Sequence, residues 1–186
     1  MGGRITLVTG GARSGKSNYA ESLAKDSKKE VAYLATAIPF DEGMKDRIKK
    51  HKLARPGTWI TYEGYKDLYK MIPKIKKEHE VVLLDCITIM VTNLMFEEDV
   101  NWDKIEHEGI DQIEEKIKEQ IVKLLTAIRE YNIWCIMVTN ELGMGIVPEN
   151  RISRIFRDIA GRMNQMIAKE ADEVYFTVSG IPMQLK

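Results

Sequence analysis

The stretch that decides the fold is RITLVTGGARSGKS, residues 4–17. Its first six residues form an apolar run that predicts a buried strand. Residues 10–17, GGARSGKS, match the pattern G-x-x-x-x-G-K-[ST] in full, and SNYAESLAK at 17–25 predicts a helix. A strand, a glycine-rich loop and a helix in this order predict a phosphate-binding loop. A plain glycine turn is the alternative.

Each part of this loop suits a nucleotide phosphate. The glycines let backbone N–H groups face the phosphates, and the helix N-terminus favours anions. Lys16 is expected to reach the β- and γ-phosphates as a catalytic cation, and the Ser17 hydroxyl is expected to bind Mg²⁺. The predicted loop residues are Gly10, Gly11, Ala12, Arg13, Ser14, Gly15, Lys16 and Ser17.

A second apolar run, VVLLDC at 81–86, ends in a carboxylate. Phosphate-loop enzymes commonly hold magnesium with an acidic residue at the end of such a strand. Asp85 is therefore the second predicted metal ligand. The alternative is an ordinary strand-end aspartate, since strand ends commonly carry Asp.

The remaining pattern alternates strands with helices. Continuous apolar runs predict buried strands at 4–9, 31–36, 80–86, 133–139 and 173–179, with a weaker candidate at 58–63. Apolar residues three or four apart predict helices over 104–131 and 149–169, with Pro148 placed to start the second. This order predicts a single α/β domain over residues 1–186 with a mostly parallel sheet. Ser179-Gly180, between two extended runs, predicts a C-terminal antiparallel hairpin.

Composition narrows the class of protein. Lys plus Arg equals Asp plus Glu at 28 each, so no global charge attracts nucleic acid. No apolar run reaches the ~18 residues of a membrane span, and the N-terminus has no signal-peptide pattern. We therefore expect a cytoplasmic protein without a nucleic-acid partner. Cys86 and Cys135 lie in apolar runs, which predicts buried thiols, and their spacing matches no zinc pattern.

The segment KDRIKKHKLARP, residues 45–56, places His51 among six cations. Nearby cations favour the neutral form of a histidine, which can act as a base, ligand or nucleophile. A solvated helix face with a surface histidine is the alternative.

The stretch at 138–165 joins a strand end to a glycine loop and then to a helix that carries four arginines. Glycines allow close backbone approach, and arginines suit phosphate recognition. A loop followed by an amphipathic helix with a charged outer face is the alternative. The four are Arg151, Arg154, Arg157 and Arg162.

Nearly the full chain resembles one family, the bifunctional adenosylcobinamide kinase / adenosylcobinamide-phosphate guanylyltransferases of cobalamin biosynthesis. The matching pieces follow the family's order along the chain. They are TGGARSGKS, YLATA, RIKKHKLARP, LLDCITIMVTNLMF, VTNELGMGIVPENR and FRDIAGRMNQ.

The resemblance implies two reactions. The first phosphorylates the aminopropanol hydroxyl of adenosylcobinamide with ATP or GTP. The second moves GMP from GTP, by way of a histidine, onto that phosphate, which gives adenosylcobinamide-GDP and pyrophosphate. It also implies a RecA-like P-loop fold and a homo-oligomer, specifically a trimer with sites near subunit boundaries.

By position, the resemblance makes His51 the guanylylated residue. Some family members carry a second histidine just before it, where this chain has Lys50. A carboxylate such as Glu63 can accept hydrogen bonds from guanine N1–H and its amino group. The remaining implied nucleotide contacts, besides the loop, are Thr36, Ala37, Ile38, Lys52, Leu53, Ala54, Arg55, Glu63 and Asp85.

Two other functions remain open on the residues alone. Another P-loop small-molecule kinase would explain the phosphate loop and Asp85 but would give His51 no task. The second possible function is a nucleotide-gated RecA-like binding protein, which would be either a switch or a nucleic-acid motor. The zero net charge and the lack of a second domain weigh against a motor.

Overall fold

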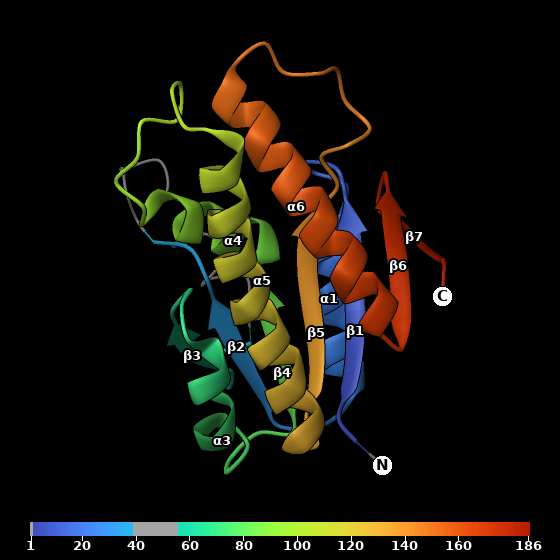
Figure 1. Ribbon diagram of the computed structural model, residues 1–186. Helices are drawn as coiled ribbons and strands as arrows, with labels where there is room; N and C mark the ends of the chain where they lie inside the picture. Colours follow the sequence, from blue (N-terminus) through green and yellow to red (C-terminus); the bar gives the residue numbers. More distant parts are fainter. Residues whose placement is uncertain (1, 39–55) are drawn as a thin grey trace.

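The computed structural model describes residues 2–38 and 56–186. Its strands form one sheet in the order β3-β2-β4-β5-β1-β6-β7 (Figure 1). Every neighbouring pair is parallel except β6 and β7, which are antiparallel. The strands are β1 (Arg4–Gly10), β2 (Val31–Ala35), β3 (Ile60–Glu63), β4 (Val81–Asp85), β5 (Trp134–Asn140), β6 (Glu173–Val178) and β7 (Ile181–Gln184). All six predicted strands are confirmed, and so is the terminal hairpin.

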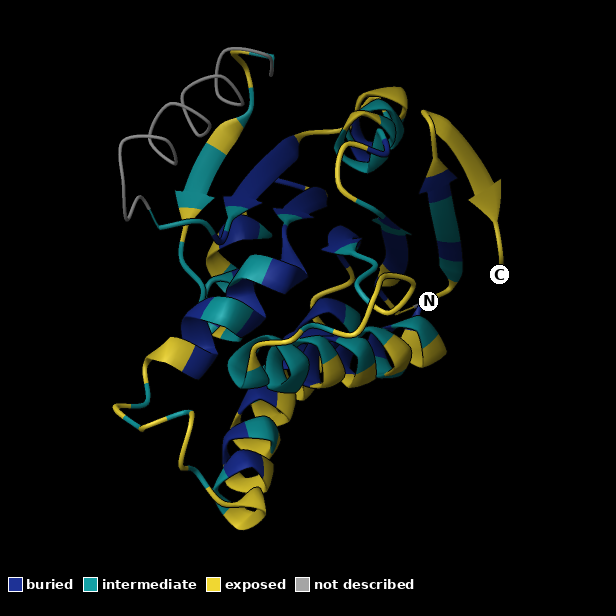
Figure 2. Cartoon of the chain, turned by 90° about the horizontal axis from the view of Figure 1, so that it is seen from above, coloured by how far each residue is buried: buried dark blue, intermediate teal, exposed yellow. Residues whose placement is uncertain are grey.

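Helices cover both faces of this sheet, as is usual where the strands are continuous apolar runs. In the view from above, α1 lies on one side of the strands, and α4, α5 and α6 lie on the other (Figure 2). The helical elements are α1 (Lys16–Asp26), η1 (Leu68–Lys70), α3 (Ile72–Ile75), α4 (Ile87–Phe96), α5 (His107–Glu130) and α6 (Arg151–Glu170). None of these helices is both long enough and apolar enough to cross a membrane.

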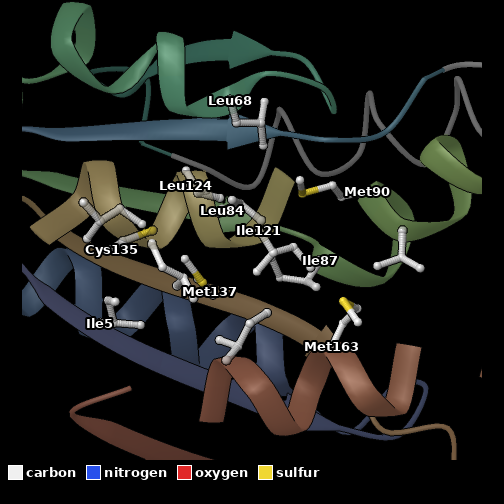
Figure 3. Packing of buried hydrophobic residues seen from close by; sticks show 14 of the residues in the cluster. Ile5, Leu68, Leu84, Ile87, Met90, Ile121, Leu124, Cys135, Met137 and Met163 are labelled. Atoms are coloured by element: carbon white, nitrogen blue, oxygen red, sulfur yellow. The ribbon is translucent and has the colours of Figure 1, made fainter. Parts of the chain in front are cut away.

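The two faces bury different apolar clusters. Alternate strand residues such as Leu84 and Met137 pack with Ile87 of α4 and Ile121 of α5 (Figure 3). The other residues of the same strands, among them Leu83 and Val138, pack with Ala20 and Ala24 of α1. Side chains alternate between the faces of a strand, so both faces of each central strand must be apolar. This is why these strands are continuous apolar runs.

The structure corrects two helix boundaries. The predicted helix at 104–131 begins at His107, because residues 101–105 form a turn in which the Asn101 carbonyl accepts from the Lys104 and Ile105 amides. The helix at 149–169 is not started by Pro148. Its N-cap is Asn150, whose side chain accepts from the Ser153 amide at 3.3 Å.

Helix α4 is absent from the sequence prediction. Its residues, ITIMVTNLMF, are buried on most sides, so they show no polar face. A helix of this kind lacks the amphipathic period by which surface helices are recognised.

Candidate active site at the phosphate loop

The turn between β1 and α1 requires glycine at two positions. Gly15 has φ +91°, a left-handed conformation that side chains disfavour, and a Cβ there would lie 2.9 Å from Gly180 Cα. A Cβ on Gly10 would lie 2.6 Å from the Thr177 carbonyl oxygen. The loop is thus tightly packed against β6 and the β6–β7 turn, and its backbone shape is fixed.

The β6–β7 turn also hydrogen-bonds the loop. The Gly180 amide donates to the Ser14 carbonyl at 2.8 Å. Ser179 and Gly180 have φ of 50° and 83°, as in the tight hairpin turns that twist with their strands. The C-terminal hairpin therefore supports the phosphate loop, a function that the sequence prediction did not give it.

Lys16 opens α1 and bends back over the loop. Its ammonium Nζ donates to the Gly11 carbonyl at 3.1 Å. The N-cap residue, Gly15, offers no side chain to the first amides of α1, so these N–H groups point out of the helix end. A cation and a helix N-terminus thus meet at one loop, which is the arrangement that binds phosphate.

Three strand ends bring the predicted carboxylates into one row. Ala35 of β2 pairs with Glu63 of β3 on one side and with Asp85 of β4 on the other. Neighbouring strands lie about 4.8 Å apart, so the two carboxylate-bearing backbones lie roughly 10 Å apart. The row lies at the carboxyl edge of a parallel sheet, where open α/β sheets bind ligands.

Side-chain alternation directs this row toward α1. Val81 and Leu83 pack in the α1 cluster, so Asp85, two residues further along β4, faces the same side. Tyr33, in the same cluster, donates its hydroxyl to Asp85 Oδ2 at 2.7 Å. This bond orients the carboxylate.

Thr36 forms hydrogen bonds within the protein that hold the end of β2 in place. Its hydroxyl accepts from the Cys86 amide at 2.8 Å and donates to the Cys86 carbonyl at 2.7 Å. Asn93 Nδ2 donates to the Thr36 carbonyl at 2.8 Å. Thr36 therefore fixes the end of β2 beside Asp85, and it delivers the half-buried Ala37 and Ile38 to this edge.

Cys86 follows Asp85 directly and is buried, as predicted. Burial raises the pKa of its thiol to about 12, and the adjacent Asp85 carboxylate adds to the effect. The thiol is therefore neutral and inert at physiological pH.

The predicted nucleophile, His51, and the predicted contacts Lys52, Leu53, Ala54 and Arg55 lie outside the described residues. The structure thus describes the phosphate loop, Thr36 to Ile38, Glu63 and Asp85. It brings Gly10 to Ser17, Glu63 and Asp85 to one edge of the sheet.

Three of the four arginines in this stretch are held by loop carbonyls or by a carboxylate on a neighbouring helix. Arg151 donates to the carbonyls of Trp102 at 2.6 Å and Ile105 at 2.5 Å, and Arg154 donates to the Pro148 carbonyl at 2.9 Å. Arg162 forms a two-point ion pair with Glu114 on α5, with N–O distances of 2.5 and 2.6 Å. These contacts hold loops and helices together and so favour the structural interpretation of this stretch.

A buried polar network behind the loop escaped the sequence prediction. Thr88 of α4 and Thr139 of β5 share a hydrogen bond of 3.1 Å, and Thr139 donates to Asn164 Oδ1 of α6 at 2.7 Å. The signal was present in the sequence as polar residues within apolar runs, but their partners are 25 to 51 residues away.

Comparison with known proteins shows which family the sequence matches. The family model described as "Cobinamide kinase / cobinamide phosphate guanyltransferase" matches residues 6–185. The chain belongs to this family. Its sequence is 47% identical over 183 residues to the "Bifunctional adenosylcobalamin biosynthesis protein CobU" of Escherichia coli (strain K12), covering 98% of this chain and 99% of that protein.

A more distant family member has a similar extent. The "Bifunctional adenosylcobalamin biosynthesis protein CobP" of Pseudomonas aeruginosa is 37% identical over 180 residues, covering 97% of this chain and 96% of that protein. Among solved structures, the RadB recombinase matches with a TM-score of 0.49 and 17% identity, over 94% of this chain and 74% of that one. The resemblance found in the sequence motifs is confirmed by the family match.

Proposed function

We propose that this chain is a bifunctional enzyme that phosphorylates adenosylcobinamide with ATP or GTP and then guanylylates the product with GTP. The observation that carries the proposal is a phosphate loop beside a row of two carboxylates, in a chain that belongs to the cobinamide kinase / guanyltransferase family. One domain would serve both reactions, because both use a nucleoside triphosphate.

In the kinase step, the substrate hydroxyl oxygen attacks the γ-phosphorus of the donor. A new O–P bond forms, the bond from γ-phosphorus to the β–γ bridging oxygen breaks, and the nucleoside diphosphate leaves with the electron pair. The hydroxyl proton passes to solvent. Lys16 and the amides of the loop stabilise the charge on the phosphates.

In the guanylyl step, a neutral ring nitrogen of His51 attacks the α-phosphorus of GTP. An N–P bond forms, pyrophosphate leaves with the electrons of the broken P–O bond, and the ring proton passes to solvent. A phosphate oxygen of adenosylcobinamide phosphate then attacks the same phosphorus, the N–P bond breaks, and the departing ring nitrogen takes a proton back from solvent. Glu63 would hold guanine through its N1–H and amino group.

Magnesium is the cofactor we propose. The Ser17 hydroxyl and the Asp85 carboxylate supply the oxygen donors that Mg²⁺ prefers, and the ion commonly takes one or two carboxylates with substrate phosphates. When bound, the ion would neutralise charge on the phosphate oxygens. Tyr33, which donates to Asp85 Oδ2, would hold the carboxylate in one orientation.

Assembly is also part of the proposal. A chain of 21.3 kDa offers little surface to enclose a corrinoid, so we propose a homo-oligomer, and a trimer by resemblance to the family. Light scattering at the working concentration measures the assembly state. A fully active monomer would contradict this part.

The deciding experiment is incubation with GTP and Mg²⁺ followed by intact-mass measurement. We expect a GMP adduct that is acid-labile and survives mild base, because a phosphoramidate behaves in this way. Label from the α-phosphate should stay with the protein, and label from the γ-phosphate should leave. His51→Asn should abolish the adduct and largely spare the kinase.

The kinase alternative makes a different prediction. Another P-loop small-molecule kinase would release γ-label to an acceptor but would never retain α-label. A wild-type chain without the adduct, or a His51→Asn variant that still traps α-label, would remove His51 from the mechanism.

A further inference from the structure

Asn140 is the last residue of β5, the strand that separates the two halves of the site. On one side of β5 lies β1, where Asn140 pairs with Gly10 at the start of the phosphate loop. On the other side lies β4, where Asp85 pairs with Val138. Asn140 is thus placed between the phosphate loop and the carboxylate.

Alternation along β5 gives the direction of this side chain. Val138 packs in the α1 cluster, and Thr139 faces the opposite side, where it donates to Asn164 of α6. Asn140 therefore faces the α1 side, as Asp85 does. Its carboxamide projects over the edge at which the loop and the carboxylate row meet.

The backbone of Asn140 is held on both sides. Its amide donates to Thr88 Oγ1 at 2.7 Å, and its carbonyl accepts from Asn164 Nδ2 at 3.0 Å. The next amide, that of Glu141, donates to the Gly10 carbonyl at 3.0 Å. Groups that bind a transition state need such fixed positions.

The carboxamide itself is not used by this network. Asn140 is half-buried, and within residues 2–38 and 56–186 its hydrogen bonds involve its main chain alone. An asparagine held by its backbone, with its side chain directed at a phosphate site, has a donor and an acceptor to offer a ligand.

The position of Lys16 indicates which phosphate group of a bound nucleotide would contact the Asn140 carboxamide. The lysine of a phosphate loop binds the β- and γ-phosphates, and here its Nζ lies 3.1 Å from the Gly11 carbonyl, at the start of the loop. Gly11 follows Gly10, the partner of Asn140. A triphosphate bound in this way would direct its β/γ end, rather than its α-phosphate, toward Asn140.

We propose that Asn140 Nδ2 donates a hydrogen bond to a nonbridging oxygen of the γ-phosphoryl group during its transfer to the substrate hydroxyl. This rests on the kinase half of the proposed function. Asn140 makes no covalent bond and moves no proton, and its donor stabilises charge that spreads over the three oxygens as the bridging P–O bond breaks. The guanylyl step, which breaks a bond at the α-phosphorus, does not need it.

The test compares both reactions in Asn140→Ala and Asn140→Asp. Aspartate keeps the shape of the side chain and removes the donor. Both variants should lower the kinase kcat by about 10²–10³-fold, the usual cost of one such donor. The KM for ATP should change little, and the rate at which the protein retains α-label from GTP should stay within a few-fold of wild type. Asn101→Ala, in the α4–α5 connection, is the matched control and should leave both rates unchanged.

The ratio of the two activities separates a direct role from a structural one. A variant that merely distorts the loop lowers both reactions together, and that result would overturn the proposal. So would an Asn140→Asp variant with near wild-type kinase kcat. A wild-type chain that forms the GMP adduct but never phosphorylates adenosylcobinamide would refute the kinase function itself. A wild type without the adduct would refute only the role of His51 as the GMP carrier.

Discussion

The face of the sheet covered by α4, α5 and α6 buries a larger apolar cluster than the face covered by α1. Ile121, Leu84 and Met137 belong to the first face. On the second face, Asp85 and the phosphate loop lie at the carboxyl ends of the strands. The same strands thus contribute to the stability of the protein on one side and carry the candidate chemistry on the other.

This division lets the two properties be changed separately. Truncation in the larger cluster leaves a cavity and lowers the free energy of unfolding. Removal of a polar group at the carboxyl edge leaves the core intact and changes the transition state instead. Variants in the larger cluster should therefore change the free energy of unfolding, whereas variants at the carboxyl edge should change the rates of reaction.

The largest expected effect is that of Lys16→Ala. Since the fold offers one phosphate loop among its described residues, both the kinase rate and the formation of the GMP adduct should fall by about 10³-fold. The melting temperature should hardly change. Lys25→Ala, in the last turn of the same helix, is the control and should keep both activities. Undiminished guanylylation in the Lys16→Ala variant would mean that GTP binds at another site.

On the opposite face, Ile121→Ala should lower the free energy of unfolding by about 2–5 kcal/mol. Ile121 is 0% exposed, so its truncation leaves a cavity, whereas its neighbour Val122 is 44% exposed. Val122→Ala should cost less than about 0.5 kcal/mol. Urea unfolding measures both. Activity per folded molecule should be unchanged at 25 °C, and a loss of kcat without a loss of stability would break the division between faces.

Tyr33→Phe tests a buried residue that belongs to the chemical face. The variant loses the 2.7 Å hydrogen bond to Asp85 Oδ2. We expect the apparent affinity for Mg²⁺ to fall by about tenfold, as for other residues that orient a metal ligand. Tyr62→Phe removes a hydroxyl from a residue that packs against the larger cluster, and it should leave the Mg²⁺ dependence unchanged. Equal effects of the two variants would contradict the role of Tyr33.

The smallest expected effect concerns the rates at which the thiols of Cys86 and Cys135 react with iodoacetamide. Burial raises the pKa of both thiols, to about 12 for Cys86, so at pH 8 the thiolate fraction of Cys86 is about 10⁻⁴. Both should react slowly with iodoacetamide in the native protein and fast in urea. Below the pKa the reaction of a thiol should quicken with pH, because the thiolate is the nucleophile.

Nucleotide adds a second readout to the same labelling experiment. Cys86 lies beside Asp85, whereas Cys135 lies in the larger cluster. GTP with Mg²⁺ should slow the labelling of Cys86 by a few-fold and leave Cys135 unchanged, because the ligand closes only the local opening at the carboxyl edge. Equal protection of both thiols would mean that nucleotide stabilises the whole fold.

The sequence by itself determined the features whose chemistry is local. The phosphate loop is a contiguous stretch, so its glycines, Lys16 and Ser17 could be assigned before any fold was known. Continuous apolar runs predicted strands buried on both faces, and Ser179-Gly180 predicted the hairpin. The family was recognisable because its motifs follow one another in order along the chain.

The tertiary structure decided which distant residues meet. Asn140 adjoins Gly10 because β5 lies between β1 and β4, and no local pattern encodes that neighbour order. Gly180 lies 165 residues after Gly15 in the sequence, yet it supports the phosphate loop. A Cβ on Gly15 would lie 2.9 Å from the Cα of Gly180. Arg151 and Arg162 looked equally suited to phosphate, yet they bind a carbonyl pair and Glu114. Residue type states what a side chain can bind, but the long-range pairing of strands and helices determines what lies within its reach.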